Sequence, residues 1–170
     1  MLTAKASVHV ERPLADVFRY MEDQENRFHW QPGLVSHVHE PLRVGAKLTE
    51  VRNLLGRRLE IKGVITAYER DRGWSFKGAG PVVKSVVYHN RFEREGEGTR
   101  IDVEAEYEGG RIFGLAQPAL QRIVEREIQS SLEHLKDMLE AHQDIHLAIA
   151  LLPPHEHRRA HPKKEAAKAR

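Results

Sequence analysis

The part of the chain that decides the fold is a pair of predicted strands followed by one long amphipathic helix. The strands lie in VVKSVVYHNRFEREGEGTRIDVEAEYE (residues 82–108) and the helix in PALQRIVEREIQSSLEHLKDMLEA (residues 118–141). In the second strand apolar side chains alternate with acidic ones, which predicts one buried face and one solvated face. Its apolar members are Ile101, Val103, Ala105 and Tyr107. A glycine-containing turn at residues 95–98 predicts that the two strands form a hairpin.

The helix predicted from Pro118 to about His142 carries a continuous apolar face. Its face residues recur at spacings of three and four, as an amphipathic helix requires. They are Leu120, Val124, Ile128, Ser131, Leu135 and Leu139. At 1.5 Å per residue such a helix is about 35 Å long, which is enough to cross a whole sheet.

The chain before residue 82 predicts mostly strands, interrupted by two short helices. The first helix begins near Pro13 and the second carries Phe28 and Trp30. The strands are predicted at residues 7–11, 34–40, 47–55, 57–70 and 74–76, followed by 82–94 and 100–108. In the strand over 57–70, four apolar side chains are predicted to share one face: Leu59, Ile61, Ile65 and Ala67.

These elements predict an α+β fold. Sequential strands joined by short turns favour an antiparallel sheet, and about seven long, twisted strands curl rather than stay flat. We expect a curved antiparallel sheet of about seven strands wrapped around the long C-terminal helix, with the two short helices after the first strand. The predicted domain covers residues 1–145, and residues 146–170 form a basic, flexible tail.

Composition narrows the class of protein. The net charge is +2, but residues 153–170 hold six basic and two acidic residues, so the tail carries +4 and the remainder carries −2. The domain therefore gives no electrostatic reason to expect a nucleic-acid partner. A solubilising role is the favoured interpretation of the tail, and weak contact with an acidic membrane surface is the alternative.

The absence of cysteine excludes disulfides and thiolate chemistry and fits a cytoplasmic location. We expect no secretory signal and no transmembrane segment.

Seven short segments, in this order and spacing, resemble the START-like or SRPBCC superfamily, nearest its polyketide cyclase/dehydrase-like branch. They span roughly residues 3–142 and are SVHV (7–10) with PLADVF (13–18), WQPGLV (30–35), VGAKL (44–48), ITAYE (65–69), GTRI (98–101) and LEHLKDMLE (132–140). The resemblance implies the helix-grip fold, in which the short helices close one end. It also implies a deep cavity for an apolar or amphiphilic ligand, while members of the superfamily differ widely in function.

Candidate catalytic residues are Glu50, Arg52 and Tyr88. Glu50 and Arg52 are two residues apart on one predicted strand, so they share a face. If that face is inward, they form a buried pair able to orient an enol or a carboxylate. Because buried charge is rare, the favoured interpretation is that both face solvent. In that case the inward residues are Thr49, Val51 and Leu55.

Candidate ligand-binding residues are aromatic, apolar or polar side chains on the presumed inner face, which serves as core and cavity wall together. They are Phe28, Trp30, Leu48, Trp74, Phe76, Tyr88, Asn90, Phe92, Tyr107, Val124, Ile128 and Ser131. His37 and His39 share a strand face, but no third ligand follows by spacing, so we expect incidental surface histidines and no metal site. We expect no cofactor.

Three functional hypotheses follow. The first is binding of a small hydrophobic or aromatic molecule, polyketide- or lipid-like, in an internal cavity. The second is an enzyme, a polyketide cyclase or dehydratase. The third is a protein-interaction module that uses the helix or the basic tail. The sequence sets no oligomeric state.

Overall fold

The computed structural model describes residues 1–108 and 116–141. Seven antiparallel strands form one sheet in the order β1-β7-β6-β5-β4-β3-β2. The strands are β1 (Leu2–Val10), β2 (Leu34–His39), β3 (Lys47–Leu54), β4 (Arg57–Glu69), β5 (Gly73–Ala79), β6 (Ser85–Glu95) and β7 (Gly98–Glu108). The helices are α1 (Leu14–Glu22), the 3-10 turn η1 (Gln24–Asn26), α2 (Arg27–Trp30) and α3 (Gln117–Ala141).

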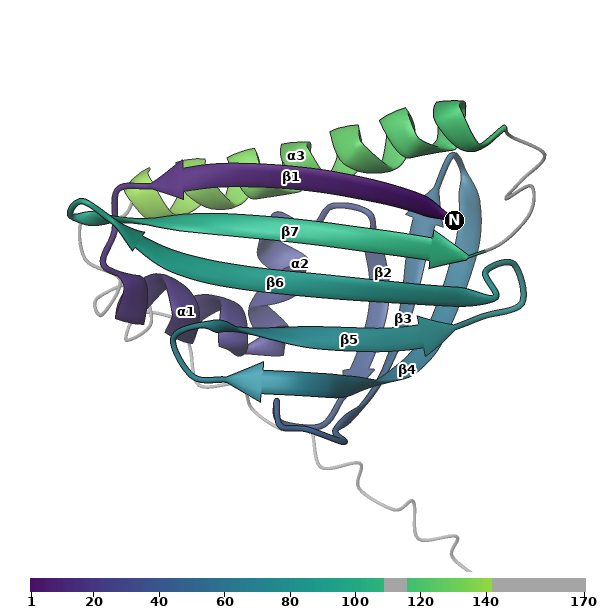
Figure 1. Cartoon of the computed structure of the whole chain (residues 1–170), viewed down its shortest axis with the longest axis horizontal. Helices are drawn as coiled ribbons and strands as arrows, with labels where there is room; N and C mark the ends of the chain where they lie inside the picture. Colours follow the sequence, from purple (N-terminus) through teal and green to yellow (C-terminus); the bar gives the residue numbers. More distant parts are fainter. Residues whose placement is uncertain (109–115, 142–170) are drawn as a thin grey trace, which may run out of the picture.

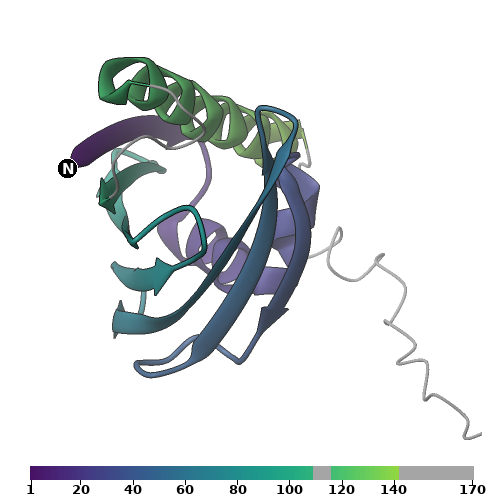
Figure 2. The same ribbon diagram turned by 90° about the vertical axis from the view of Figure 1, so that its right-hand side faces the viewer.

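The sheet curls around the inner space, and α3 lies across its open side. Figures 1 and 2 show α3 running alongside the edge strand β1, while β4, β3 and β2 curve round to the opposite side. The segment α1, η1 and α2 lies across one end of the curl (Figure 1). The predicted helix-grip arrangement is therefore confirmed.

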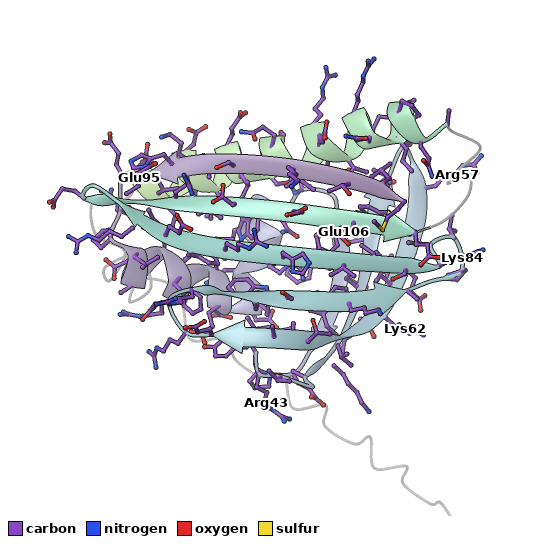
Figure 3. The ribbon with its side chains drawn as sticks, viewed as in Figure 1. Arg43, Arg57, Lys62, Lys84, Glu95 and Glu106 are labelled. Carbon is purple, nitrogen blue, oxygen red and sulfur yellow. The ribbon has the colours of Figure 1, made fainter. Side chains whose placement is uncertain are left out.

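The predicted alternation in β7 is confirmed. Val103, Ala105 and Tyr107 are buried on the concave face, whereas Asp102, Glu104 and Glu106 lie on the convex face. Figure 3 shows labelled charged side chains, among them Lys62 and Glu106, at the outside of the sheet. Five of the six residues predicted for the apolar face of α3 are buried, namely Leu120, Val124, Ser131, Leu135 and Leu139. Ile128 is only half-buried, and Leu132, which the prediction does not include, is buried as well.

One prediction about β4 is wrong. Ile65 is buried, but Ala67 is exposed, because the register with β5 shifts between these two residues. Such a bulge places two residues opposite one and reverses the inward and outward alternation beyond it. Tyr68 consequently turns inward, and its ring lies 6.3 Å from that of Phe18 on α1.

The end of α3 is fastened to the start of the chain. Arg12 donates hydrogen bonds from Nε to the Leu139 carbonyl and from Nη2 to the Glu140 carbonyl, each at 3.0 Å. Lys136 Nζ donates to the His9 carbonyl at 2.8 Å. The two Arg12 bonds satisfy carbonyls at the C-terminal end of the helix, and all three bonds hold the helix against the first strand and the residues that follow it.

Among residues 1–108 and 116–141 there is no helix long and apolar enough to cross a membrane. The predicted tail, from residue 146 onward, lies outside the described residues, as does the predicted helix end at His142.

Candidate functional site

The concave face of the sheet and α3 enclose a cavity of about 90 Å³. Its wall is mostly apolar and aromatic, with a polar group of side chains at one end. Of the predicted ligand-binding residues, ten line it: Trp30, Leu48, Trp74, Phe76, Tyr88, Asn90, Tyr107, Val124, Ile128 and Ser131. Glu50 and Arg52 line the same cavity.

Two predicted ligand-binding residues lie elsewhere. Phe28 is 43% exposed and packs near His37, because two residues along a helix point in different directions and Trp30 takes the inward one. Phe92 is buried, but it packs with Phe18 and Trp74, at ring distances of 5.1 and 5.3 Å, rather than lining the cavity. Its place is in the core beneath α1.

The favoured prediction that Glu50 and Arg52 face solvent is wrong. Glu50 is only 2% exposed, and the Arg52 side chain is 13% exposed. The alternation of β3 places both of them on the concave face, together with Leu48 and Leu54. Leu55, which the favoured interpretation places inward, is instead exposed at the tip of the hairpin.

Arg27 of α2 provides the charge that pairs with the buried carboxylate. Its Nη2 lies 2.6 Å from Glu50 Oε2, while Arg52 Nε lies 3.9 Å from Glu50 Oε1. Gln31 joins the two cations, because its Oε1 accepts a bond from Arg52 Nη2 at 2.8 Å and from Arg27 Nη2 at 3.0 Å. Gln24 Oε1 accepts a further bond from Arg27 Nη1 at 3.5 Å.

This arrangement keeps the polar end charged. Burial alone opposes ionisation of Glu50, but the guanidinium groups of Arg27 and Arg52 outweigh it and hold the pKa of Glu50 below its ordinary value. Burial also opposes the charge on Arg52, and the neighbouring Glu50 carboxylate outweighs it, so the pKa of Arg52 is raised. The site therefore holds a fixed carboxylate between two fixed cations.

Tyr88 and Tyr107 form a hydroxyl pair on the cavity wall. Their hydroxyl groups are hydrogen-bonded to each other, and their rings meet edge to face at 6.0 Å. Burial raises the pKa of both phenols, most strongly that of Tyr107. Both are therefore neutral and polar at physiological pH.

His37 lies behind the charged group rather than on an ordinary surface. Its ring stacks on that of His39 at 4.8 Å, and its Nε2 is 3.2 Å from Arg27 Nη1. Burial, together with the nearby Arg27 and His39, lowers the pKa of His37 to about 4. The ring is thus neutral and accepts the Arg27 hydrogen bond at Nε2.

Within the described part of the chain, no group of three or more His, Asp or Glu side chains could hold a metal ion.

Sequence reasoning predicted Trp30 of α2 but missed the polar side chains that η1, α2 and the residue after α2 bring to this site. Gln24, Arg27 and Gln31 all line the cavity. Their spacing of three and four residues places them on one face of a helical segment, the signal that could have found them. That face also includes Trp30, whose aromatic ring was predicted to line the cavity.

Comparison with known proteins agrees with this architecture. The family model described as "Polyketide cyclase / dehydrase and lipid transport" matches residues 1–140. A search among curated proteins finds no match to this chain.

Three solved structures illustrate the likeness of fold. TTHA0849 from Thermus thermophilus has a TM-score of 0.73 at 19% identity, and the match covers 84% of this chain and 99% of that one. The Zhui aromatase/cyclase from Streptomyces has a TM-score of 0.69 at 14% identity, over 81% and 93%. The Helicobacter pylori protein jhp0584 has a TM-score of 0.67 at 12% identity, over 80% and 86%.

Sequence identities this low support a likeness of fold alone. The family model, by contrast, spans the whole of the described sheet and nearly all of α3. The chain belongs to the polyketide cyclase/dehydrase and lipid transport family.

Proposed function

We propose that this protein binds a small hydrophobic or aromatic molecule, polyketide- or lipid-like, in its internal cavity. The observation that carries the proposal is the cavity wall itself, where apolar and aromatic side chains surround a few fixed polar groups. That combination is typical of small-molecule sites, in which apolar surface supplies affinity and a few polar atoms set orientation.

The size of the cavity sets a condition on binding. A volume of about 90 Å³ is smaller than the ~150 Å³ cavity that admits benzene. A ligand as large as one aromatic ring therefore needs some lining side chains to move. Half-exposed lining residues lie where α3 faces the loop before β2, namely Gln31, Glu127 and Ile128. Glu127 Oε1 of α3 approaches Gly33 of that loop. The cavity is proposed to open at this boundary between α3 and the loop.

A cyclase or dehydratase is the second candidate, because Glu50, Arg52, Tyr88 and Asn90 line one cavity. A general acid or base works best with a pKa near the operating pH. Here the pKa of Glu50 is lowered, while those of Tyr88 and Tyr107 are raised. These shifts move away from neutrality, so the polar groups are better suited to holding a ligand than to exchanging protons with it.

Native mass spectrometry of the full chain, purified from its own host, tests the proposal directly. We expect a bound small molecule in the wild type. Ile128→Trp fills the cavity from α3 and should abolish its retention, whereas Ser130→Trp, on the exposed face of the same helix, should not. The proposal fails if wild-type protein carries no ligand and also binds none of a broad panel of apolar compounds.

A further inference from the structure

Three polar atoms on residues that line the cavity lack hydrogen-bond partners, and a fourth such buried atom, His37 Nδ1, belongs to a residue outside the cavity lining. The three cavity atoms are Trp30 Nε1, Glu50 Oε1 and Arg52 Nε, each buried and without a hydrogen-bond partner among the described residues. All three residues line the cavity. A buried polar atom left unpaired is costly, so a group of such atoms on a cavity wall indicates a site that something else satisfies.

Glu50 Oε1 and Arg52 Nε are held in place because another atom of the same carboxylate or guanidinium group is hydrogen-bonded. Glu50 Oε2 is fixed by Arg27 at 2.6 Å, and Arg52 Nη2 is fixed by Gln31 at 2.8 Å. The remaining pair, Glu50 Oε1 and Arg52 Nε, is 3.9 Å apart. That distance is too long for a direct hydrogen bond but is suited to a group that bonds to both atoms.

The hydrogen-bonding chemistry of the three atoms defines which ligand head group can bind to them. An ionised carboxylate only accepts hydrogen bonds, whereas guanidinium and indole N–H groups only donate them. A matching head group must therefore present one donor next to one acceptor. Building on the proposed function, we propose that this end of the cavity recognises a neutral head group with an N–H beside a carbonyl, such as a carboxamide or lactam.

In the proposed pose, the ligand N–H donates to Glu50 Oε1 and its carbonyl oxygen accepts from Arg52 Nε. The indole N–H of Trp30 is a second donor for the carbonyl, whose oxygen has two lone pairs. Both bonds to charged groups belong to the stronger class of hydrogen bond.

An anionic head group is a poor match despite the two arginines. A carboxylate has no donor for Glu50 Oε1 and would place a second negative charge beside it. Arg27 is already bonded to Glu50, Gln31 and Gln24. A plain ketone has an acceptor but again leaves Glu50 Oε1 unpaired.

Four compounds of nearly equal size and shape separate these possibilities: benzamide, benzoate, acetophenone and cumene. Any side-chain movement needed to admit the ring is common to all four, so their relative affinities for the full chain isolate the head group. We expect calorimetry or NMR titration to give a Kd for benzamide at least about tenfold lower than for the other three, as a charge-assisted hydrogen bond implies.

Trp30→Phe removes one donor and keeps an aromatic ring. It should reduce the preference for benzamide over cumene by about threefold or more. Trp74→Phe is the matched control, since Trp74 lines the same cavity but its indole nitrogen is not among the unpaired buried atoms; it should keep that preference.

Equal binding of benzamide and cumene, or tighter binding of benzoate, would overturn the inference while leaving the proposed function standing. Failure of all four to bind would overturn the inference. It would also contradict the proposed function only if native mass spectrometry finds no retained small molecule and a broad panel of apolar compounds does not bind either. If Trp30→Phe does not fold, the wild-type series alone decides the matter.

Discussion

Arg27 Nη2 and Glu50 Oε2 are 2.6 Å apart, and this contact joins two elements that are 23 residues apart in the chain. Arg27 begins the four-residue helix α2, and Glu50 lies in the middle of β3. Their side chains are 13% and 3% exposed. A carboxylate this deeply buried stays ionised only because a cation is brought to it, so the helices that close the end of the sheet also set the charge inside it.

Replacing Arg27 with Met should leave Glu50 buried with only the more distant Arg52. We expect a loss of about 3–5 kcal/mol in the free energy of unfolding, the usual cost of breaking a buried ion pair from one side. The pKa of Glu50 should rise, because burial opposes its charge and the nearest cation is gone. Urea unfolding and a pH titration of stability measure the two effects.

A double variant tests whether the pair itself is responsible. Arg27→Met with Glu50→Gln removes both charges and should recover at least part of the stability lost in Arg27→Met. Arg43→Met is the control for losing an arginine, since Arg43 is 68% exposed and its pair with Glu40 spans 3.5 Å; it should cost less than about 1 kcal/mol. If the double variant is no more stable than the single one, the stabilising role of this pair is wrong.

The sheet and the long helix could be predicted because local patterns determine them. The alternation over residues 100–108 and the spacing from Leu120 to Leu139 each fit one type of element. The reversal at Ala67 could not be predicted, because a bulge depends on pairing with β5 rather than on the strand's own sequence.

The inward direction of Glu50 escaped prediction for a related reason. In β3, Glu50 and Arg52 alternate with Thr49 and Val51, so each face offers a plausible inner surface by composition. The deciding factor is Arg27, which belongs to a helix too short to give a clear periodic signal. A sequence rule that avoids buried charge fails wherever a distant segment brings the opposite charge.

His37 should make stability depend on pH in a defined window. Its pKa is about 4 in the folded protein, against an ordinary value of 6.5. Between these values the unfolded chain binds a proton that the folded protein does not, so stability should fall as pH is lowered from 6.5 towards 4. The slope has a ceiling of about 1.4 kcal/mol per pH unit, and partial exposure of the ring reduces it.

His37→Gln should flatten this dependence in urea unfolding measured between pH 6.5 and 4.5. His134→Gln, at an exposed position of α3, controls for the loss of a histidine and should keep the wild-type slope. If His37→Gln keeps the wild-type slope, His37 is not the source of this pH dependence.

The four tyrosines should resist ionisation in the folded protein. Burial, with Asp23 nearby, raises the pKa of Tyr20 to about 12, and burial, with a hydrogen bond to Glu22, raises that of Tyr68 to about 12. The pKa values of Tyr88 and Tyr107 are also raised by burial. Ultraviolet absorbance should therefore show clearly less tyrosinate at pH 10 in native protein than the roughly half ionisation expected after unfolding in denaturant.

The same shifts predict a loss of stability in alkali. Above pH 10 the unfolded chain releases tyrosine protons that the folded protein keeps, so unfolding becomes easier as pH rises. A native titration with an inflection near pH 10 would show that at least one tyrosine is not protected.

The β3–β4 hairpin contains a residue poorly suited to its backbone. Leu55 and Gly56 form the two-residue loop between the paired residues Leu54 and Arg57, with φ of 54° and 73°. Two positive φ values are the mark of a type I′ turn, for which Asn-Gly is a favoured sequence.

Leu55 is 53% exposed, so little apolar contact is lost on replacement. Leu55→Asn should raise the free energy of unfolding by about 0.5–1 kcal/mol, since the left-handed conformation costs a leucine about 1–2 kcal/mol and an asparagine less. Leu55→Ala removes the same exposed side chain without easing the backbone, so urea unfolding should show no comparable gain; equal stabilisation by both substitutions would assign the effect to lost apolar exposure instead.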